Sequence, residues 1–233
     1  MTEHTVKAFD DDINALRALI AEMGGRTEDA IDNAMRALTN RDLELAKSVV
    51  AGDARIDELD AHIERLVVQT IALRAPMADD LREIIAVLKI TGIVERMADY
   101  AKNIAKRVET VAAISPRLEP LSLLPSMAQI AREMVKSALD AFAARDPQLA
   151  LQVIDRDRAV DDFYNSIFRT MVTFMMENQK MISESAHVLF IAKNLERIGD
   201  HATNIAEMVY YVATGSKPPE REKGTAVDLL AED

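Results

Sequence analysis

The sequence predicts an all-α protein built from two tandem, homologous three-helix bundles, and three observations lead to this fold class. First, its 233 residues include only 7 Gly, 7 Pro and 4% aromatic residues, while 49% are hydrophobic, a composition that favours helix over sheet. Second, apolar residues recur at helical spacing along almost the whole chain. Third, a segment near the end of the first half returns near the end of the second half.

Breaks in the helical spacing define six segments. Pro76 ends the second segment, and Asp146-Pro147 is typical of an N-cap followed by a proline in the first helical turn. Gly215 stops the last segment, and Gly24-Gly25 is a weak point at which the first helix can kink. The predicted helices are 6–38, 42–74, 77–112, 122–144, 147–177 and 181–213.

Each half is expected to form one bundle. The proline-rich stretch 115–125 separates the third and fourth helices and is the predicted domain boundary. Residues 1–114 then form the first three-helix unit and residues 121–214 the second. Residues 215–233, which are polar and rich in turn-forming residues, are expected to form a mobile tail.

The two halves share a specific repeat. Glu95–Ala105 (ERMADYAKNIA) and Glu196–Ala206 (ERIGDHATNIA) are identical at seven of eleven positions, with an offset of 196 − 95 = 101. Upstream, Arg41-Asp42 returns as Arg145-Asp146, with an offset of 145 − 41 = 104. Ordinary residue usage makes such agreement by chance untenable, and the offset is expected to change at the turn after the second helix of each half.

Composition excludes several classes of function. A net charge of 28 − 39 = −11 disfavours nucleic acid and anionic lipid as partners. It leaves cations and basic protein surfaces, although a negative charge also simply keeps a protein soluble. The absence of Cys excludes disulfides and thiolate metal sites. No apolar run reaches the length of a transmembrane segment and no signal-peptide core stands at the start, so a cytosolic protein is expected.

The repeated segment places acidic residues in a stripe. Glu95, Asp99 and Asn103 are four residues apart, so they share one face of a helix. Met97 and Ile104 lie on the opposite face, so the stripe is predicted to face outward. In each half, the antiparallel hairpin adds two aspartates from the preceding helix at the same level. The candidate metal ligands are therefore Asp53, Asp57, Glu95, Asp99 and Asn103 in the first half, and Asp157, Asp161, Glu196, Asp200 and Asn204 in the second half.

A bound metal cation is the sharper interpretation of these carboxylates. Like charges four residues apart repel each other without compensation, and carboxylate and amide oxygens suit hard cations. Divalent or ferric metal ions are therefore expected, with Fe, Mn, Mg, Ca and Zn as candidates. The alternative is a solvated face on which Arg96 and Arg197 neutralise part of the charge, and the residues alone leave both interpretations open.

No catalytic motif is evident. His62, His187 and His201 are expected to be surface or helix-contact residues. Glu184–His187 is a single Glu-x-x-His motif, whereas ferritin-like metal enzymes supply two. No glycine-rich phosphate loop and no nucleophile–base pair is found. Four methionines near the second turn suit core packing by default, or an adaptable docking surface: Met171, Met175, Met176 and Met181.

The paired Glu-Arg-x-x-Asp segments, each followed by Asn-Ile-Ala, resemble the signature of the PhoU family. Pro76–Arg82 (PMADDLR), at the entry to the third helix, is similar to that family as well. The similarity covers residues 6–213. The second half departs from it, because Glu184-Ser185 stands in the region that corresponds to Asp80–Arg82.

The resemblance implies a non-enzymatic accessory protein. PhoU proteins act at the inner face of the membrane between the phosphate-specific ABC transporter and a sensor histidine kinase, and keep the phosphate-starvation response off when phosphate is plentiful. Some carry metal clusters on motifs that correspond to Glu95/Asp99 and Glu196/Asp200. We therefore expect a cytoplasmic, homodimeric negative regulator of phosphate uptake, peripheral to the inner membrane through its protein partners. A metal-free helical scaffold and a ferritin-like metal enzyme are the alternatives.

Overall fold

The computed structural model describes residues 2–113 and 122–219, and within these stretches the fold is all-α, as predicted. Six long helices form it, together with one short helix and one 3-10 turn, and no strand occurs in these stretches. The elements are α1 (Thr2–Asn40), α2 (Leu43–Arg74), α3 (Asp79–Ala105), α4 (Val108–Ala112), α5 (Leu124–Ala144), α6 (Pro147–Glu177), η2 (Gln179–Met181) and α7 (Ile182–Thr214).

The third predicted helix, 77–112, is not continuous. α3 begins only after Ala78, which adopts a positive φ of 51°, and it ends at Ala105, before α4. Val108 and Val111 are nevertheless buried, at the positions that the helical spacing assigns to them. The apolar pattern runs through the break, so the pattern could not reveal it.

α1 remains helical through Gly24-Gly25, the weak point of its sequence. The two glycines have different surroundings. A Cβ added at Gly24 would stand 2.2 Å from Cδ1 of Leu139 on α5, whereas one added at Gly25 would meet nothing within 4 Å. Gly24 therefore permits a close approach of α1 to α5 rather than a kink.

Each half begins its second helix in the same way. Arg41 and Arg145 end the preceding helix with positive φ angles of 56° and 51°. The next residue, Asp42 or Asp146, caps the new helix with its side chain. The Asp42 carboxylate, for example, accepts a hydrogen bond from the backbone N–H of Leu45 at 2.9 Å. The repeat in the sequence is thus also a repeat of backbone conformation.

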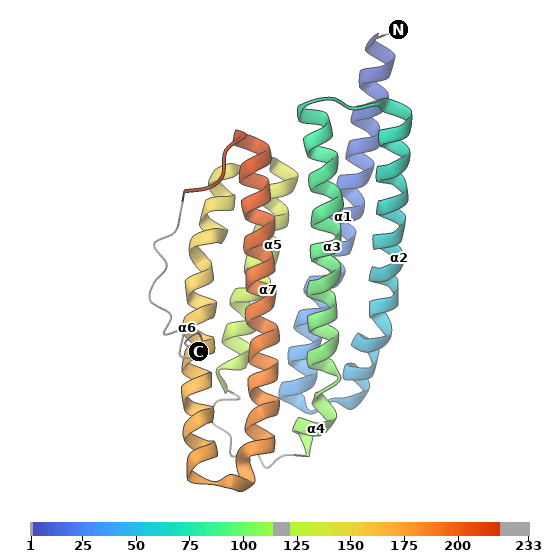
Figure 1. Ribbon diagram of the computed structural model, residues 1–233. Coiled ribbons are helices and arrows are strands. Elements are labelled where there is room, and N and C mark those ends of the chain that lie inside the picture. The colour runs from blue at the N-terminus through green and yellow to red at the C-terminus, as the bar shows by residue number, and fades with distance from the viewer. Residues whose placement is uncertain (1, 114–121, 220–233) are drawn as a thin grey trace, which may run out of the picture.

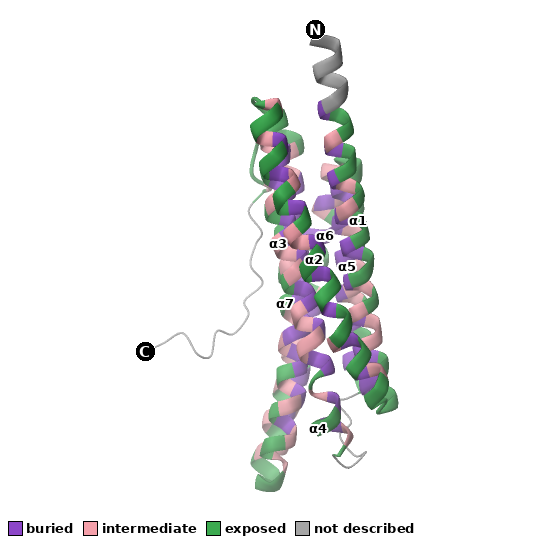
Figure 2. Ribbon diagram, turned by 90° about the vertical axis from the view of Figure 1, so that its right-hand side faces the viewer, coloured by how far each residue is buried: buried purple, intermediate pink, exposed green. Residues whose placement is uncertain are grey.

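The two halves lie side by side and run in opposite directions. α1, α2 and α3 pack against one another, as do α5, α6 and α7, and contacts of α1 with α5 and of α3 with α7 join the two groups. Figure 1 shows the α2–α3 turn at one end of the molecule and the α6–α7 turn at the other. Figure 2 shows the elongated shape. One cluster of buried apolar side chains runs through both halves.

Two predictions fall largely on residues outside the described stretches. The domain boundary at 115–125 coincides mostly with residues 114–121, and most of the predicted tail coincides with residues 220–233. Among the described helices, none combines the length and apolar character that crossing a membrane requires.

Candidate functional site

In the first half, the predicted acidic residues meet between α2 and α3. Asp53 on α2 is only 6% exposed, and the ammonium group of Lys102 on α3 donates hydrogen bonds to its carboxylate and, at 3.0 Å, to that of Asp99. These hydrogen bonds raise the pKa of Lys102, so it stays charged. Burial, and then the charge of Asp99, raises the pKa of Glu95, while burial and then Asp53 raises the pKa of Asp57. Lys102 therefore neutralises part of a self-repelling cluster.

In the second half, the corresponding residues meet between α6 and α7 without a lysine at the same place. The counterpart of Lys102 is Thr203 (102 + 101 = 203). Lys193 donates instead to Oε1 of Glu196 at 2.6 Å, while Oε2 of Glu196 is buried without a hydrogen-bond partner. Asp200 is exposed to solvent, yet desolvation by its neighbours, and then the charge of Glu196, raises its pKa to about 6. Burial and the neighbouring acids therefore disfavour the charged form of Asp200 in this cluster.

The predicted outward orientation of the acidic residues is partly right. Met97 and Ile104 are fully buried on the opposite face of α3, as expected. Asp53 and Asp157, however, are each only 6% exposed, so the two aspartates added by the preceding helices do not share the outward orientation of the stripe. Both lie where the two helices of their hairpin meet, and Asp53 there accepts a hydrogen bond from the neighbouring helix.

The compensating charges also differ from those that the sequence suggested. Lys102 and Lys193 form the ion pairs with the carboxylates, whereas Arg197 lies over the ring of Tyr100 on the other half. A signal for Lys102 was present, because it follows Asp99 by three residues and so lies on the same side of α3. It was missed because the repeat carries no lysine at the equivalent position.

The two clusters suit a cation unequally. Within residues 2–113 and 122–219, no three Asp, Glu or His side chains stand in an arrangement that could hold a metal ion. In the second half, the unpartnered Oε2 of Glu196 is a buried acceptor that a cation would satisfy. In the first half, an ion between Asp53 and Asp99 would have to displace Lys102. The donor groups therefore fit a cation better in the second half.

The two halves meet through equivalent residues. Tyr100 on α3 stacks on His201 on α7 with ring centroids 5.5 Å apart, and the two positions correspond in the repeat (100 + 101 = 201). The guanidinium group of Arg197 lies 5.7 Å from the Tyr100 ring centroid. Burial, and then the charge of Arg96, which is the counterpart of Arg197 in the repeat, lowers the pKa of His201. Nδ2 of Asn204 lies 3.4 Å from Nδ1 of His201. His201 is a helix-contact residue, and an approximate twofold axis relates the halves.

Polar contacts tie α3 to the second half on either side of this stack. Glu83, only 3% exposed, forms ion pairs with Arg17 on α1 and with Arg145 at the end of α5. Just before α4, Nη1 of Arg107 lies 2.9 Å from Nδ1 of His187 on α7. Sequence reasoning missed Glu83, because helical spacing does not distinguish a glutamate that is buried with arginines from an exposed one.

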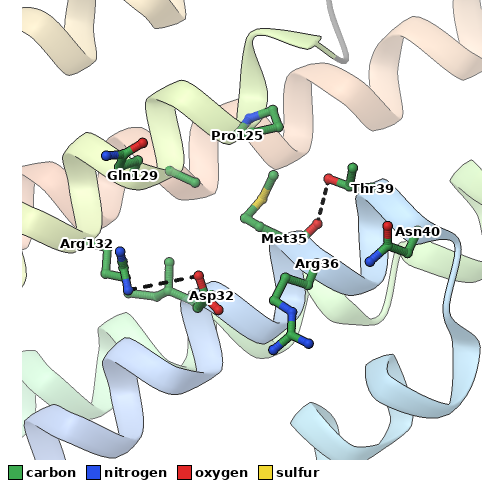
Figure 3. Close-up of a pocket in the computed structure, with 10 residues that line it drawn as sticks. Asp32, Met35, Arg36, Thr39, Asn40, Pro125, Gln129 and Arg132 are labelled. Carbon is green, nitrogen blue, oxygen red and sulfur yellow. Dashed lines mark hydrogen bonds and ion pairs between the residues drawn. The ribbon is translucent and has the colours of Figure 1, made fainter.

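A cavity of about 260 Å³ lies between α1 and α5. Its volume is slightly below that of typical small-molecule sites, which hold about 300–1,000 Å³. Figure 3 shows Arg132 on α5 beside Asp32 on α1, 3.9 Å apart, while the side chain of Met35 points towards Pro125. Helical spacing could not reveal this cavity, because its walls come from different halves. Its lining consists of Ile31, Asp32, Met35, Arg36, Thr39, Asn40, Pro125, Ala128, Gln129 and Arg132.

Comparison with known proteins agrees with the repeat and the fold. A model of the PhoU domain matches residues 20–108 and 124–209. The phosphate-specific transport system accessory protein PhoU homolog of Zymomonas mobilis is 55% identical over 228 residues, which cover 98% of this chain and 95% of that protein. The homolog of Rhizobium meliloti is 43% identical over 228 residues, covering 97% and 96%. The crystal structure of PhoU from Pseudomonas aeruginosa matches with a TM-score of 0.85 at 36% identity, covering 89% of this chain and 100% of that one. The chain therefore belongs to the PhoU family.

Proposed function

We propose that this protein is a negative regulator of phosphate uptake and of the phosphate-starvation response, and that it acts as an adaptor between a phosphate ABC transporter and a sensor histidine kinase. The observation that carries the proposal is its membership of the PhoU family over most of the chain. The relatives compared above are named as accessory proteins of a phosphate-specific transport system. A shared fold and a repeat that matches the family model twice support the transfer of that role.

In this proposal the protein works by contact and not by catalysis, as a cytoplasmic homodimer held at the inner membrane face by its partners. Its charge of −11 favours basic partner surfaces, and long-range attraction between opposite charges speeds association. The on-rate with such a partner should fall as salt rises, because exposed charges are screened over about 10 Å at 0.1 M.

Metal cations on the carboxylate clusters are the second part of the proposal. Asp157, Asp161, Glu196, Asp200 and Asn204 would hold an ion in the second half once their side chains moved closer together. The equivalent first-half residues would hold one only if Lys102 also moved aside. The unpartnered buried oxygen of Glu196 supports this assignment. A divalent or ferric ion would add positive charge among these mutually repelling carboxylates.

The regulatory role is tested by deleting the gene. We expect the phosphate-starvation response, followed with a transcriptional reporter, to be derepressed in phosphate-rich medium and to be repressed again when the gene is restored. If the reporter stays repressed in the deletion strain and no paralogue substitutes, the regulator assignment is wrong and the scaffold alternative becomes the better one.

The metal assignment is tested by elemental analysis of the purified protein after reconstitution with each candidate ion. Two matched double variants separate the halves: Glu196→Gln with Asp200→Asn, and Glu95→Gln with Asp99→Asn. Because Lys102 already occupies the place between Asp53 and Asp99 in the first cluster, we expect the second-half pair to remove more metal than the first-half pair. Unmutated protein that takes up no metal would refute this part while leaving the regulatory role intact.

A further inference from the structure

The surface of the α2–α3 hairpin carries acids that are followed, towards the turn, by exposed apolar side chains. Lys102 fixes the register of the two helices, because it is hydrogen-bonded to both Asp53 and Asp99. In this antiparallel pair, Asp60, seven residues after Asp53, therefore lies level with Gly92, seven residues before Asp99. We call this surface the α2–α3 face and define it by Asp60, Glu64 and Val68 on α2 and by Leu81, Ile85 and Gly92 on α3.

The acids of this face repel one another. Burial, and then the charges of Glu64 and Asp57, raises the pKa of Asp60. Burial, then Asp99 and then Asp60 raise the pKa of Glu95, which shows that the acids of the two helices are close together. Neither Asp60 nor Glu64 forms an ion pair with a side chain that the structure describes. A cation from outside the chain would therefore be favoured here.

The apolar side chains nearer the turn are open to solvent. Val68 is 66% exposed, Leu81 39% and Ile85 38%. Val68 follows Glu64 by four residues, so the two lie on one side of α2. Ile85 precedes Gly92 by seven residues and lies on the same side of α3 as the glycine. Adjoining exposed apolar side chains of this kind are typical of an interaction surface.

Gly92 leaves the face without a side chain between the acids and the apolar residues. A Cβ added there would meet nothing within 4 Å, so no described part of the chain requires a glycine at this position, although glycine inside a helix is unfavourable relative to alanine. Gly25 and Gly52 are equally open. Gly92 differs from them because it lies level with Asp60 and beside exposed apolar residues, where an approaching helix would benefit from the missing side chain.

The second half covers the equivalent place with its own side chains. The counterpart of Gly92 is Lys193 (92 + 101 = 193), and that of Asp60 is Tyr164 (60 + 104 = 164). Nζ of Lys193 lies 5.2 Å from the Tyr164 ring centroid and donates a hydrogen bond to Glu196. The second half thus supplies an internal ammonium at this position, whereas the first half has a glycine beside acids.

We propose that the α2–α3 face is the docking surface for a basic amphipathic helix of a partner protein. Apolar residues of that helix would lie over Val68, Leu81 and Ile85. Its lysine or arginine, about two turns farther along, would lie beside Asp60 and Glu64, in the place that Lys193 takes in the second half. A helix fits because a third helix packs naturally over an antiparallel pair. This inference rests on the proposed function in one respect, namely that the protein acts by contact with another protein.

Binding is tested by fluorescence anisotropy with the full chain, a chelator and two labelled helical peptides. One peptide carries leucines at i, i+3, i+4 and i+7 and lysines on the same face about two turns farther along, and the other has glutamates in place of the lysines. We expect only the lysine peptide to bind, and its affinity to fall as salt rises. Equal binding of both peptides, or binding of neither at millimolar concentration, would overturn the proposal.

A substitution copied from the second half gives the sharper test. Gly92→Lys should place an ammonium and a long side chain on the face and weaken binding of the lysine peptide about tenfold or more. Gly25→Lys, the same change at an equally open glycine of α1, should change the affinity less than about twofold. Gly92→Ala should raise the melting temperature yet weaken binding about fivefold, because the added methyl group meets the docked helix. Gly92→Ala that binds as the unmutated protein does would contradict the close approach.

The acids are tested separately. Asp60→Asn with Glu64→Gln should weaken binding of the lysine peptide about fivefold, as expected for two exposed ion pairs. Asp11→Asn with Asp29→Asn removes the same charge from exposed positions of α1 and should change the affinity less than about twofold. Equal losses in the two double variants would mean that only net charge matters and would refute a specific face. Circular dichroism checks that all variants fold.

A reporter in cells separates this inference from the proposed function. If deletion of the gene derepresses the phosphate-starvation reporter, and Gly92→Lys derepresses it while Gly25→Lys does not, the α2–α3 face is the regulatory contact. If deletion derepresses the reporter and Gly92→Lys leaves it repressed, the regulator assignment stands and the docking surface is refuted. A dimer that Gly92→Lys dissociates in analytical ultracentrifugation would show that a second copy of the chain occupies the face, which also overturns the proposal.

Discussion

The two carboxylate clusters occupy equivalent places in the repeat, yet their charge is balanced in different ways. In the first half, Lys102 connects the buried Asp53 to Asp99. In the second half, that position is Thr203, and the nearest lysine pairs with only one oxygen of Glu196. The acids have been kept in both halves, while the lysine at position 102 has not.

A repeated acidic motif therefore does not by itself define a repeated site. Removing one partner of a buried ion pair leaves an uncompensated charge, which costs far more than an intact pair contributes. The first cluster is therefore expected to depend on its own lysine for stability. The second cluster, with its unsatisfied buried oxygen, is expected to gain from whatever cation reaches it.

Converting the first cluster into the second should have the largest effect. Lys102→Thr leaves Asp53 buried without its ammonium; such a loss costs about 3–5 kcal/mol at a fully buried site. Because Lys102 is 25% exposed, we expect the free energy of unfolding to fall by about 2 kcal/mol, measured by urea denaturation with a chelator. Adding Asp53→Asn should restore most of it. A double variant as unstable as the single one would show that lost packing, not charge, is responsible.

Substitution of the equivalent residues Asp200 and Asp99 by asparagine should change the free energy of unfolding by an intermediate amount and in opposite directions. The pKa of Asp200 is raised to about 6, above the value of about 3.9 in an unfolded chain, so ionisation costs the folded state stability as pH rises from about 4 to about 6. Asp200→Asn avoids this cost. Since Asp200 is exposed to solvent, we expect the Asp200→Asn variant to be only about 1 kcal/mol more stable than the unmutated protein at neutral pH. Below about pH 4 the two proteins should be equally stable.

Asp99→Asn should instead lower the free energy of unfolding at neutral pH, because it weakens the hydrogen bond from Lys102. Thermal or urea unfolding of both variants across the same pH range, in a chelator, makes the comparison. Shifts of the same sign in the two variants would mean that the two clusters are equivalent after all.

The smallest changes in stability are expected for substitutions at the two ends of the α1–α5 contact. Gly24 packs against Leu139, whereas its counterpart Ala128 (24 + 104 = 128) lines the cavity. Gly25→Ala should stabilise the protein by about 0.5–1 kcal/mol through helix propensity. Gly24→Ala should not be stabilising, because the added methyl group would collide with Leu139. Ala128→Leu should raise the free energy of unfolding by up to about 1 kcal/mol, because it fills the cavity. Melting temperatures would rank the three, and Gly24→Ala equal to Gly25→Ala would contradict the close packing.

Local features of the fold could be predicted from the sequence because they depend on neighbouring residues. Asp146 caps α6 where the sequence predicted a cap, and Gly215 ends α7 with a positive φ of 73°. The break between α3 and α4 could not be predicted, because buried Val108 and Val111 continue the apolar spacing across it. Periodicity reports which face is buried and not whether the backbone is continuous.

The candidate site could be predicted only in part, for a different reason. That the acidic residues gather in each hairpin follows from spacing and antiparallel packing. The i,i+3 spacing places Lys102 beside Asp99 and Lys193 beside Glu196. It does not reveal that Lys102 also reaches Asp53 on the neighbouring helix. The cavity beside Met35 and the ion pairs of Glu83 depend on contacts between the two halves, which no pattern within one half can reveal.

Tyr100 stacks on His201, its counterpart in the repeat, and this pairing bears on how the two halves can acquire different substitutions. An interface in which a residue meets its own counterpart is the kind that two identical subunits form about a twofold axis. Here both subunits are halves of one chain, so their association is intramolecular and independent of protein concentration. In a symmetric dimer, a substitution alters both copies at once. In this chain a residue of one half can be substituted while its counterpart in the other half is kept. Tyr100 therefore faces His201, and Lys102 in the first half corresponds to Thr203 in the second half.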